Sequence, residues 1–80
     1  MYQLSGVTKY RDDILLKKFG ENLRKIRLAK GLSQEFIATR AGIPVSQIGR
    51  IERGEINTTI STAYLLSNVL EVKIEYLFMN

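Results

Sequence analysis

The side chains best suited to chemistry in this sequence are basic, and their chemistry is the binding of anions. Residues 17–53 carry nine bases and three acids, whereas residues 1–16 hold two of each and residues 54–80 hold one base and three acids. The net charge of +4 is therefore concentrated in the middle of the chain. Such a field favours a polyanionic partner, although a solvated basic surface would carry the same charges. Five basic residues are expected to add to the positive electrostatic potential without contacting the partner directly: Lys17, Lys18, Lys25, Lys30 and Arg40.

The sequence lacks the usual groups of a catalytic or metal centre. It contains no cysteine and no histidine, which removes disulfides, Cys-based zinc sites and the commonest metal ligand and general base. Its serines, glutamates and lysines do not place a nucleophile, a base and an orienting group at a recognisable spacing. We therefore expect no enzyme, no metal and no cofactor. The absence of a signal peptide or a membrane-spanning stretch predicts a cytoplasmic protein.

Residues 34–53, QEFIATRAGIPVSQIGRIER, suggest two short helices joined by a tight corner. Ser33 is a good N-cap for the first of them, which should end near Ala41. Two helices cross closely at a steep angle only if the crossing residues are small and the corner can take unusual dihedrals. Ala38 and Gly42 supply those two properties.

The second short helix should run from Pro44 or Val45 to Arg53, because a proline fixes φ and needs no N–H in a first turn. Ile48 and Ile51 recur at helical spacing and identify its inward face. The opposite, outward face then consists of Val45, Ser46, Gln47, Gly49 and Arg50.

A longer helix should precede this pair, from about Arg11 to Lys30, with Gly31 as its stop. Its apolar residues recur at helical spacing and are Ile14, Leu15, Phe19, Leu23, Ile26 and Leu28. Gly20 costs on the order of 1 kcal/mol relative to alanine in a helix interior. A helix that begins near Lys17, after a separate short helical turn, is therefore the alternative.

The C-terminal third should add two more helices. Thr59 is a plausible cap for a helix over residues 60–70, whose core positions would be Leu66, Val69 and Leu70. An apolar end at Ile74, Tyr76, Leu77 and Phe78 favours a final helix. Residues 1–10 show no period and are interpreted as an N-terminal arm without an assigned role. The sequence thus predicts an all-α, compact five-helix bundle over residues 11–80, a single domain.

The two-helix region resembles the helix-turn-helix of the lambdoid phage repressors, Cro proteins and related xenobiotic-response-element-type bacterial regulators. That pattern places a glutamine, a small residue, a glycine and later aliphatics at positions that hold Gln34, Ala38, Gly42, Ile43, Ile48 and Ile51. It also has Glu-Arg-Gly after the second helix and an arginine in the preceding helix, found as Glu52, Arg53, Gly54 and Arg27. The family often has Ser or Thr at Pro44, and usually Gly and Ser at Glu71 and Lys73. The resemblance covers roughly residues 19–78 and implies a lambda-repressor-like fold.

The resemblance implies that the second short helix reads base edges in the major groove of DNA. The family's reading positions fall on Val45, Ser46 and Arg50, and Gln47 lies on the same exposed face. Arg50 is the strongest candidate, because its planar fork matches the two acceptors of guanine. A phosphate contact is the alternative for Arg50.

Other roles follow from the same resemblance. The expected contacts to the DNA backbone are Ser33, Gln34, Arg53 and Asn57. Gln34 would act together with the free N–H groups at the start of its helix. Arg27 and Glu52 should form a partly buried ion pair that holds the reading helix at its angle.

One reading helix touches too few base pairs to locate a site, so we expect a homodimer on a palindromic operator. The candidate interface residues are Tyr64, Leu65, Ile74, Tyr76, Leu77 and Phe78. The implied function is a sequence-specific, double-stranded DNA-binding transcriptional regulator, such as a Cro-like repressor or a restriction-modification controller protein. The alternatives are the antitoxin of a toxin-antitoxin pair and a protein interaction module, which would have a protein partner such as a toxin or polymerase.

Overall fold

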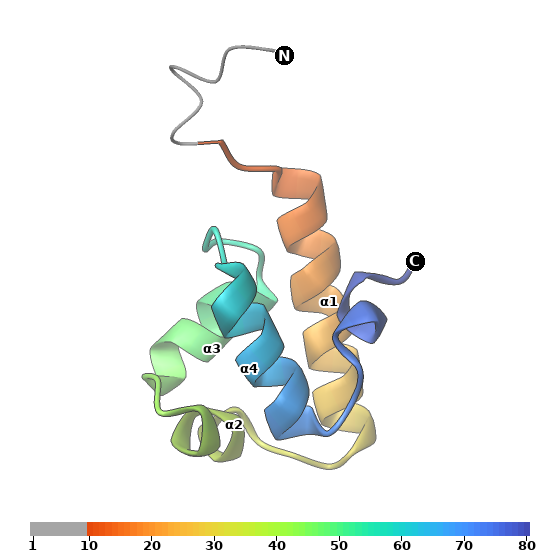
Figure 1. Cartoon of the computed structure of the whole chain (residues 1–80). Helices are drawn as coiled ribbons and strands as arrows, with labels where there is room; N and C mark the ends of the chain where they lie inside the picture. The colour runs from red at the N-terminus through yellow and green to blue at the C-terminus, as the bar shows by residue number, and fades with distance from the viewer. Residues whose placement is uncertain (1–9) are drawn as a thin grey trace.

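The structure, a computed structural model, describes residues 10–80, and the regular secondary structure of this part of the chain is all helical (Figure 1). Its elements are α1 (Asp13–Ala29), α2 (Gln34–Ala41), α3 (Val45–Glu52), α4 (Ile60–Leu70) and a 3-10 segment, η1 (Ile74–Phe78). The all-α class is confirmed. The predicted count of five helices was wrong, because residues 74–78 form a 3-10 segment. The predicted N-terminal arm, residues 1–10, lies outside the described residues except for Tyr10.

α1 is one continuous helix, so the alternative start near Lys17 was wrong. The Asp12 carboxylate accepts a hydrogen bond from the Leu15 N–H at 3.0 Å and caps the helix. The helix continues through Gly20 because that glycine lies against the end of α3. A Cβ atom built on Gly20 would lie 2.5 Å from the Glu52 carbonyl oxygen, so only glycine allows this approach.

The ends of α2 and α4 follow the predicted capping signals. Ser33 Oγ accepts from the Phe36 N–H at 3.0 Å, and Thr59 Oγ1 accepts from the Thr62 N–H at 3.1 Å. Gly42 ends α2 in the left-handed region, with φ of 72°, and its N–H donates to the Ala38 carbonyl. The corner between α2 and α3 therefore forms as its composition predicts.

The segment after α4 is not an α-helix, and it lacks the glycine and the serine cap that usually precede the last helix in the resembling family. Glu71 takes the left-handed conformation, φ 59°, at the position where the resembling family usually has glycine. Such a backbone costs a non-glycine residue roughly 1–3 kcal/mol. Lys73 then provides no side-chain cap for the following turn. The residues that follow form a short 3-10 segment of five residues, Ile74–Phe78.

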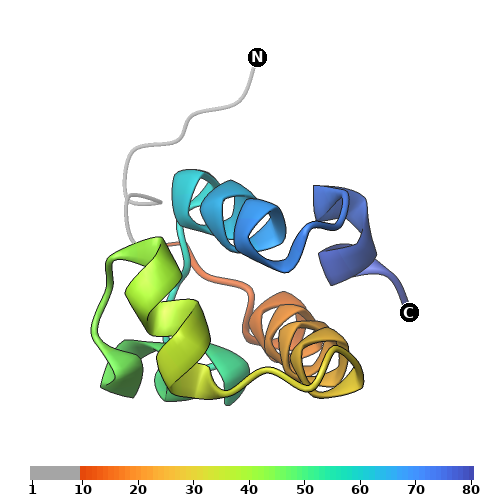
Figure 2. The same ribbon diagram turned by 90° about the horizontal axis from the view of Figure 1, so that it is seen from below.

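The core lies where the helices enclose one another, with α2 packed on α3 and α4, and α1 packed on α3 and η1 (Figure 2). Its buried members are Phe19, Leu23, Ile37, Ala38, Ile48, Ile51, Ala63, Leu66, Leu70 and Leu77. Val69 is partly buried beside them. Within residues 10–80, no helix combines the length and hydrophobicity that crossing a membrane requires.

η1 is attached to α1 by polar and apolar contacts. Asn22 Nδ2 donates to the Leu77 carbonyl at 3.0 Å and to the Met79 carbonyl at 2.7 Å. The Phe78 ring packs on Phe19 with centroids 5.3 Å apart. Leu77 itself is fully buried in this chain, so its prediction as a dimer-interface residue was wrong. An apolar C-terminal segment must supply core as well as surface, and Leu77 is the residue that points inward.

Candidate nucleic-acid interface

α3 buries one face and presents the other. Ile48 and Ile51 are 0% and 1% exposed, whereas Val45 is 42% exposed. Ser46 and Arg50 are also exposed, and Gln47 is half-buried. The three predicted reading positions therefore protrude from a helix whose opposite side is fixed in the core, as the isoleucine spacing predicted.

Gly49 does not belong to that outward face, contrary to the prediction. It is buried between two polar side chains: a Cβ atom built there would lie 3.1 Å from Arg53 Nη1 and 3.7 Å from the Gln34 amide. One helical position rotates by about 100°, so Gly49 turns from the outward face toward the start of α2. Its small size leaves room for the ends of both side chains.

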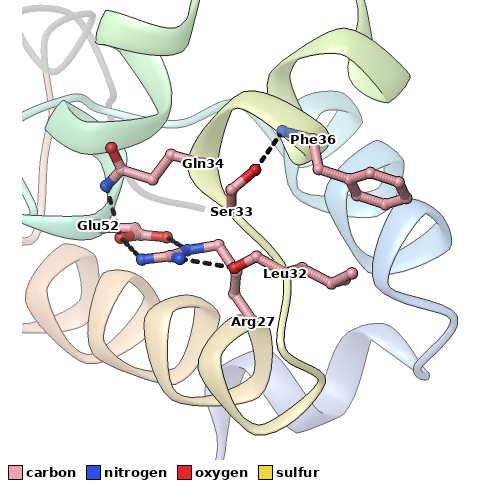
Figure 3. A network of polar contacts seen from close by, with 6 residues as sticks. All are labelled: Arg27, Leu32, Ser33, Gln34, Phe36 and Glu52. Carbon is pink, nitrogen blue, oxygen red and sulfur yellow. Dashed lines mark hydrogen bonds and ion pairs between the residues drawn. The ribbon is translucent and has the colours of Figure 1, made fainter.

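A buried polar network fixes the end of α3 (Figure 3). The Arg27 guanidinium donates from Nε to Glu52 Oε2 at 2.6 Å and from Nη2 to Glu52 Oε1 at 3.1 Å. Its Nη1 donates to the Leu32 carbonyl at 2.9 Å. The two charged side chains are only 8% and 2% exposed. The expected ion pair is thus present, in a bidentate form that restrains angle as well as distance.

Gln34 is also part of this network. Its Nε2 donates to Glu52 Oε1 at 3.0 Å. An amide nitrogen carries two N–H groups, so one donor is still available to an anion. Ser33 similarly keeps its hydroxyl hydrogen after accepting from Phe36, because a hydroxyl both accepts and donates. The start of α2 therefore presents donors whose positions are set by Glu52 and by the cap.

The outer arginines converge on a residue that the sequence reading missed, Glu55. Its carboxylate accepts from Arg53 Nε at 2.9 Å and from Arg53 Nη2 at 3.4 Å. Arg50 Nε lies 3.7 Å from the same carboxylate. The sequence signal was the placement of Glu55 directly after Gly54, whose left-handed φ of 74° turns the chain back at the end of α3.

Asn57, predicted to contact the DNA backbone, has a second connection. Its Nδ2 donates to the Tyr10 carbonyl at 3.0 Å. This bond joins the loop after α3 to the first described residue of the chain. The second N–H of the same amide leaves a donor for another acceptor.

The pairing of Glu55 with Arg53 predicts how this carboxylate titrates. The hydrogen bond from Arg53, followed by the coulombic attraction of Arg53, holds the pKa of Glu55 below its ordinary 4.5. A depressed folded-state pKa means that the pair is intact above 4.5 and is lost as the pH falls through the lowered value. Carbon-detected NMR titration of Glu55 should give a midpoint under 4.5, and Arg53→Gln should move it back upward. An identical midpoint in both proteins would show that Arg53 is not the cause.

The geometry of α2 and α3 can be compared with known proteins. The helix-turn-helix family matches residues 23–77, which include both helices and the ion pair. The chain belongs to the helix-turn-helix family. The control protein C.SmaI of Serratia marcescens is 39% identical over 54 residues, which cover 68% of this chain and 64% of that protein. This chain thus spans a little less than two thirds of that helix-turn-helix relative.

Solved helix-turn-helix proteins of similar structure include restriction-modification controllers. C.AhdI from Aeromonas hydrophila is 41% identical, with a TM-score of 0.76 over 79% of this chain and 96% of that one. C.Esp1396I, solved as a tetramer in complex with its natural 35 base-pair operator, is 36% identical. Its TM-score is also 0.76, over 84% of this chain and 88% of that one.

Proposed function

We propose that this protein is a sequence-specific regulator of transcription that binds double-stranded DNA as a homodimer on a palindromic operator, in the manner of a restriction-modification controller protein. The observation that carries the proposal is the exposed polar face of α3, held at a fixed angle by the buried Arg27–Glu52 pair. The similarity to controller proteins supports the same class. The protein acts by occupying DNA in the cytoplasm and performs no reaction of its own.

In this proposal α3 enters the major groove. The residues that read base edges are Val45, Ser46, Gln47 and Arg50. Arg50 is the main reader, with its fork directed to a guanine, and Val45 meets a thymine methyl group. The residues that contact phosphates are Ser33, Gln34, Arg53 and Asn57. Gln34 acts with the N-terminal end of α2, whose free N–H groups favour an anion.

The proposed dimer interface uses the apolar surface of α4 and η1. Tyr64 is 58% exposed, Tyr76 48% and Phe78 41%. Leu65, 37% exposed, and the partly buried Ile74 complete the set. Large apolar side chains gathered on adjacent elements favour burial against a partner. A second copy is the partner that a palindromic site requires.

Arg50→Ala tests the reading role. If Arg50 contacts a guanine, operator affinity should fall by about 1–3 kcal/mol, roughly 5- to 150-fold, while affinity for unrelated duplex falls less. Arg53→Ala should instead weaken both duplexes by similar factors, because phosphates carry no sequence information. Fluorescence anisotropy at fixed salt measures both. Equal losses on the two duplexes for Arg50→Ala would assign Arg50 to a phosphate.

Selection of bound duplexes from a random pool tests the function as a whole. The expected product is a palindrome whose half-sites lie about one helical turn, 10 to 10.5 base pairs, apart. Sedimentation of the protein on that duplex should give two chains per site. A pool that shows no enrichment, or a single half-site bound by one chain, would contradict the proposal.

A further inference from the structure

We propose that Glu55 is a specificity-determining residue, which orients Arg50 for base reading and opposes binding to unrelated DNA. This inference rests on the proposed function. In this inference Glu55 contacts no base itself. It acts on DNA discrimination from the edge of the reading face, through the arginines beside it.

The first step is the position of the carboxylate. Glu55 lies within hydrogen-bond or ion-pair distance of two arginines of the reading helix and its cap, at 3.7 Å from Arg50 Nε and 2.9 Å from Arg53 Nε. All three side chains are roughly half exposed, at 57% for Arg50, 60% for Arg53 and 48% for Glu55. Arg50 lies on the exposed face of α3, and Arg53 caps the end of that helix. The carboxylate that pairs with both therefore lies at the edge of the exposed face.

The second step is which atoms Glu55 engages. Glu55 approaches Arg50 at Nε, 3.7 Å away, rather than at the two terminal nitrogens of the guanidinium. Those terminal nitrogens form the fork that matches the O6 and N7 acceptors of guanine. A carboxylate at Nε limits the rotamers of Arg50 without occupying the fork. Glu55 therefore prepares Arg50 for a base and can stay in place when the base is bound.

The third step is the effect on unrelated DNA. Binding of that kind depends almost entirely on attraction between basic side chains and phosphates. Glu55 offsets part of the charge of Arg53, so a phosphate must compete with it for the same donors. This cost applies to both complexes, but only the operator complex recovers it, through the positioned fork of Arg50, and that difference raises the specificity ratio.

The test compares Glu55→Gln with wild type on the selected operator and on a scrambled duplex of equal length. Glutamine keeps the shape and removes the charge. Affinity for scrambled duplex should rise about threefold, and the ratio of operator to scrambled affinity should fall by about three- to tenfold. The salt slope on scrambled duplex should steepen by about one. An unchanged melting temperature would confirm that these shifts do not come from unfolding.

Glu71→Gln is the matched control. It removes the same charge from an exposed glutamate at the C-terminal end of α4, a helix of 11 residues or roughly 16 Å, whereas Glu55 lies in the loop before that helix begins. An equal fall in the ratio for Glu71→Gln would overturn the inference, because net charge would then explain it. A second arm places Glu55→Gln in an Arg50→Ala background. There the operator-specific part of the effect should disappear, and its persistence would also overturn the inference.

The outcomes separate this inference from the function on which it rests. A wild type that does not distinguish operator from scrambled duplex overturns both. If wild type distinguishes the two duplexes and Glu55→Gln has the same ratio of operator to scrambled affinity, the proposed function stands. The role of Glu55 is then overturned.

Discussion

Glu52→Ala should lower the free energy of unfolding by about 3–5 kcal/mol, because it leaves the Arg27 guanidinium buried without its partner. Arg27 is 7% exposed, and its other acceptor is a single backbone carbonyl of Leu32. The total free energy of unfolding of a small domain is only about 5–15 kcal/mol, so the substitution would remove much of the stability. Urea unfolding followed by circular dichroism measures the change, and DNA affinity should fall in parallel.

The matched control for Glu52→Ala is an ion pair of similar length on the surface. Arg11 Nε lies 2.9 Å from Asp13 Oδ1, and the two side chains are 42% and 70% exposed. Arg11→Ala should cost less than about 1 kcal/mol, since exposed pairs contribute little. If Glu52→Ala kept the wild-type melting temperature and still lost DNA binding, Glu52 would act on DNA directly and not through the angle of α3.

Gly20→Ala should destabilise the protein by about 3 kcal/mol, near the upper end for an overpacked core. The added methyl group would meet the carbonyl oxygens of Ile51 and Glu52, and backbone atoms cannot move aside as a flexible side chain can. α3 would have to shift away from α1. Differential scanning calorimetry should show a lower melting temperature, and operator affinity should fall with the displaced helix.

Gly49→Ala separates this packing effect from helix propensity. It is also a glycine inside a helix, but its nearest neighbours are the ends of the Arg53 and Gln34 side chains. Alanine there should leave stability unchanged or raise it by up to about 1 kcal/mol, the propensity difference. Gly20→Ala should therefore lower the free energy of unfolding, whereas Gly49→Ala should not. A gain of stability from Gly20→Ala would mean that α1 and α3 do not approach as closely as described.

The elements that the sequence predicted well are those whose signals are local. Ser33, Gly42 and Thr59 act on backbone groups within four residues, so their chemistry determines the helix ends without reference to the rest of the fold. The inward direction of Ile48 and Ile51 likewise depends only on helical period. These residues were enough to place the two short helices and the exposed side chains of α3.

The elements that the sequence predicted poorly depend on distant contacts. Gly20 has a low helix propensity, and its presence inside α1 is explained only by the close approach of the α3 backbone. Leu77 and Phe78 are equally apolar, yet Leu77 faces inward and Phe78 is 41% exposed. Glu55 belongs to the acidic third of the chain by sequence, but a turn at Gly54 places it beside two arginines. The distribution of charge along the sequence could not reveal that Glu55 lies beside these arginines.

The hydrogen bonds of Asn22 give α1 a further consequence for the proposed dimer. α1 holds the end of α3 through Gly20 and Arg27, and it holds η1 through the two hydrogen bonds from Asn22. One continuous helix thus connects the part that is proposed to meet DNA to the part that is proposed to meet a second copy. The separation of the two reading helices is then a fixed length of the protomer. An extra base pair between half-sites turns them by about 34° relative to each other, and α1 offers no hinge to follow that turn.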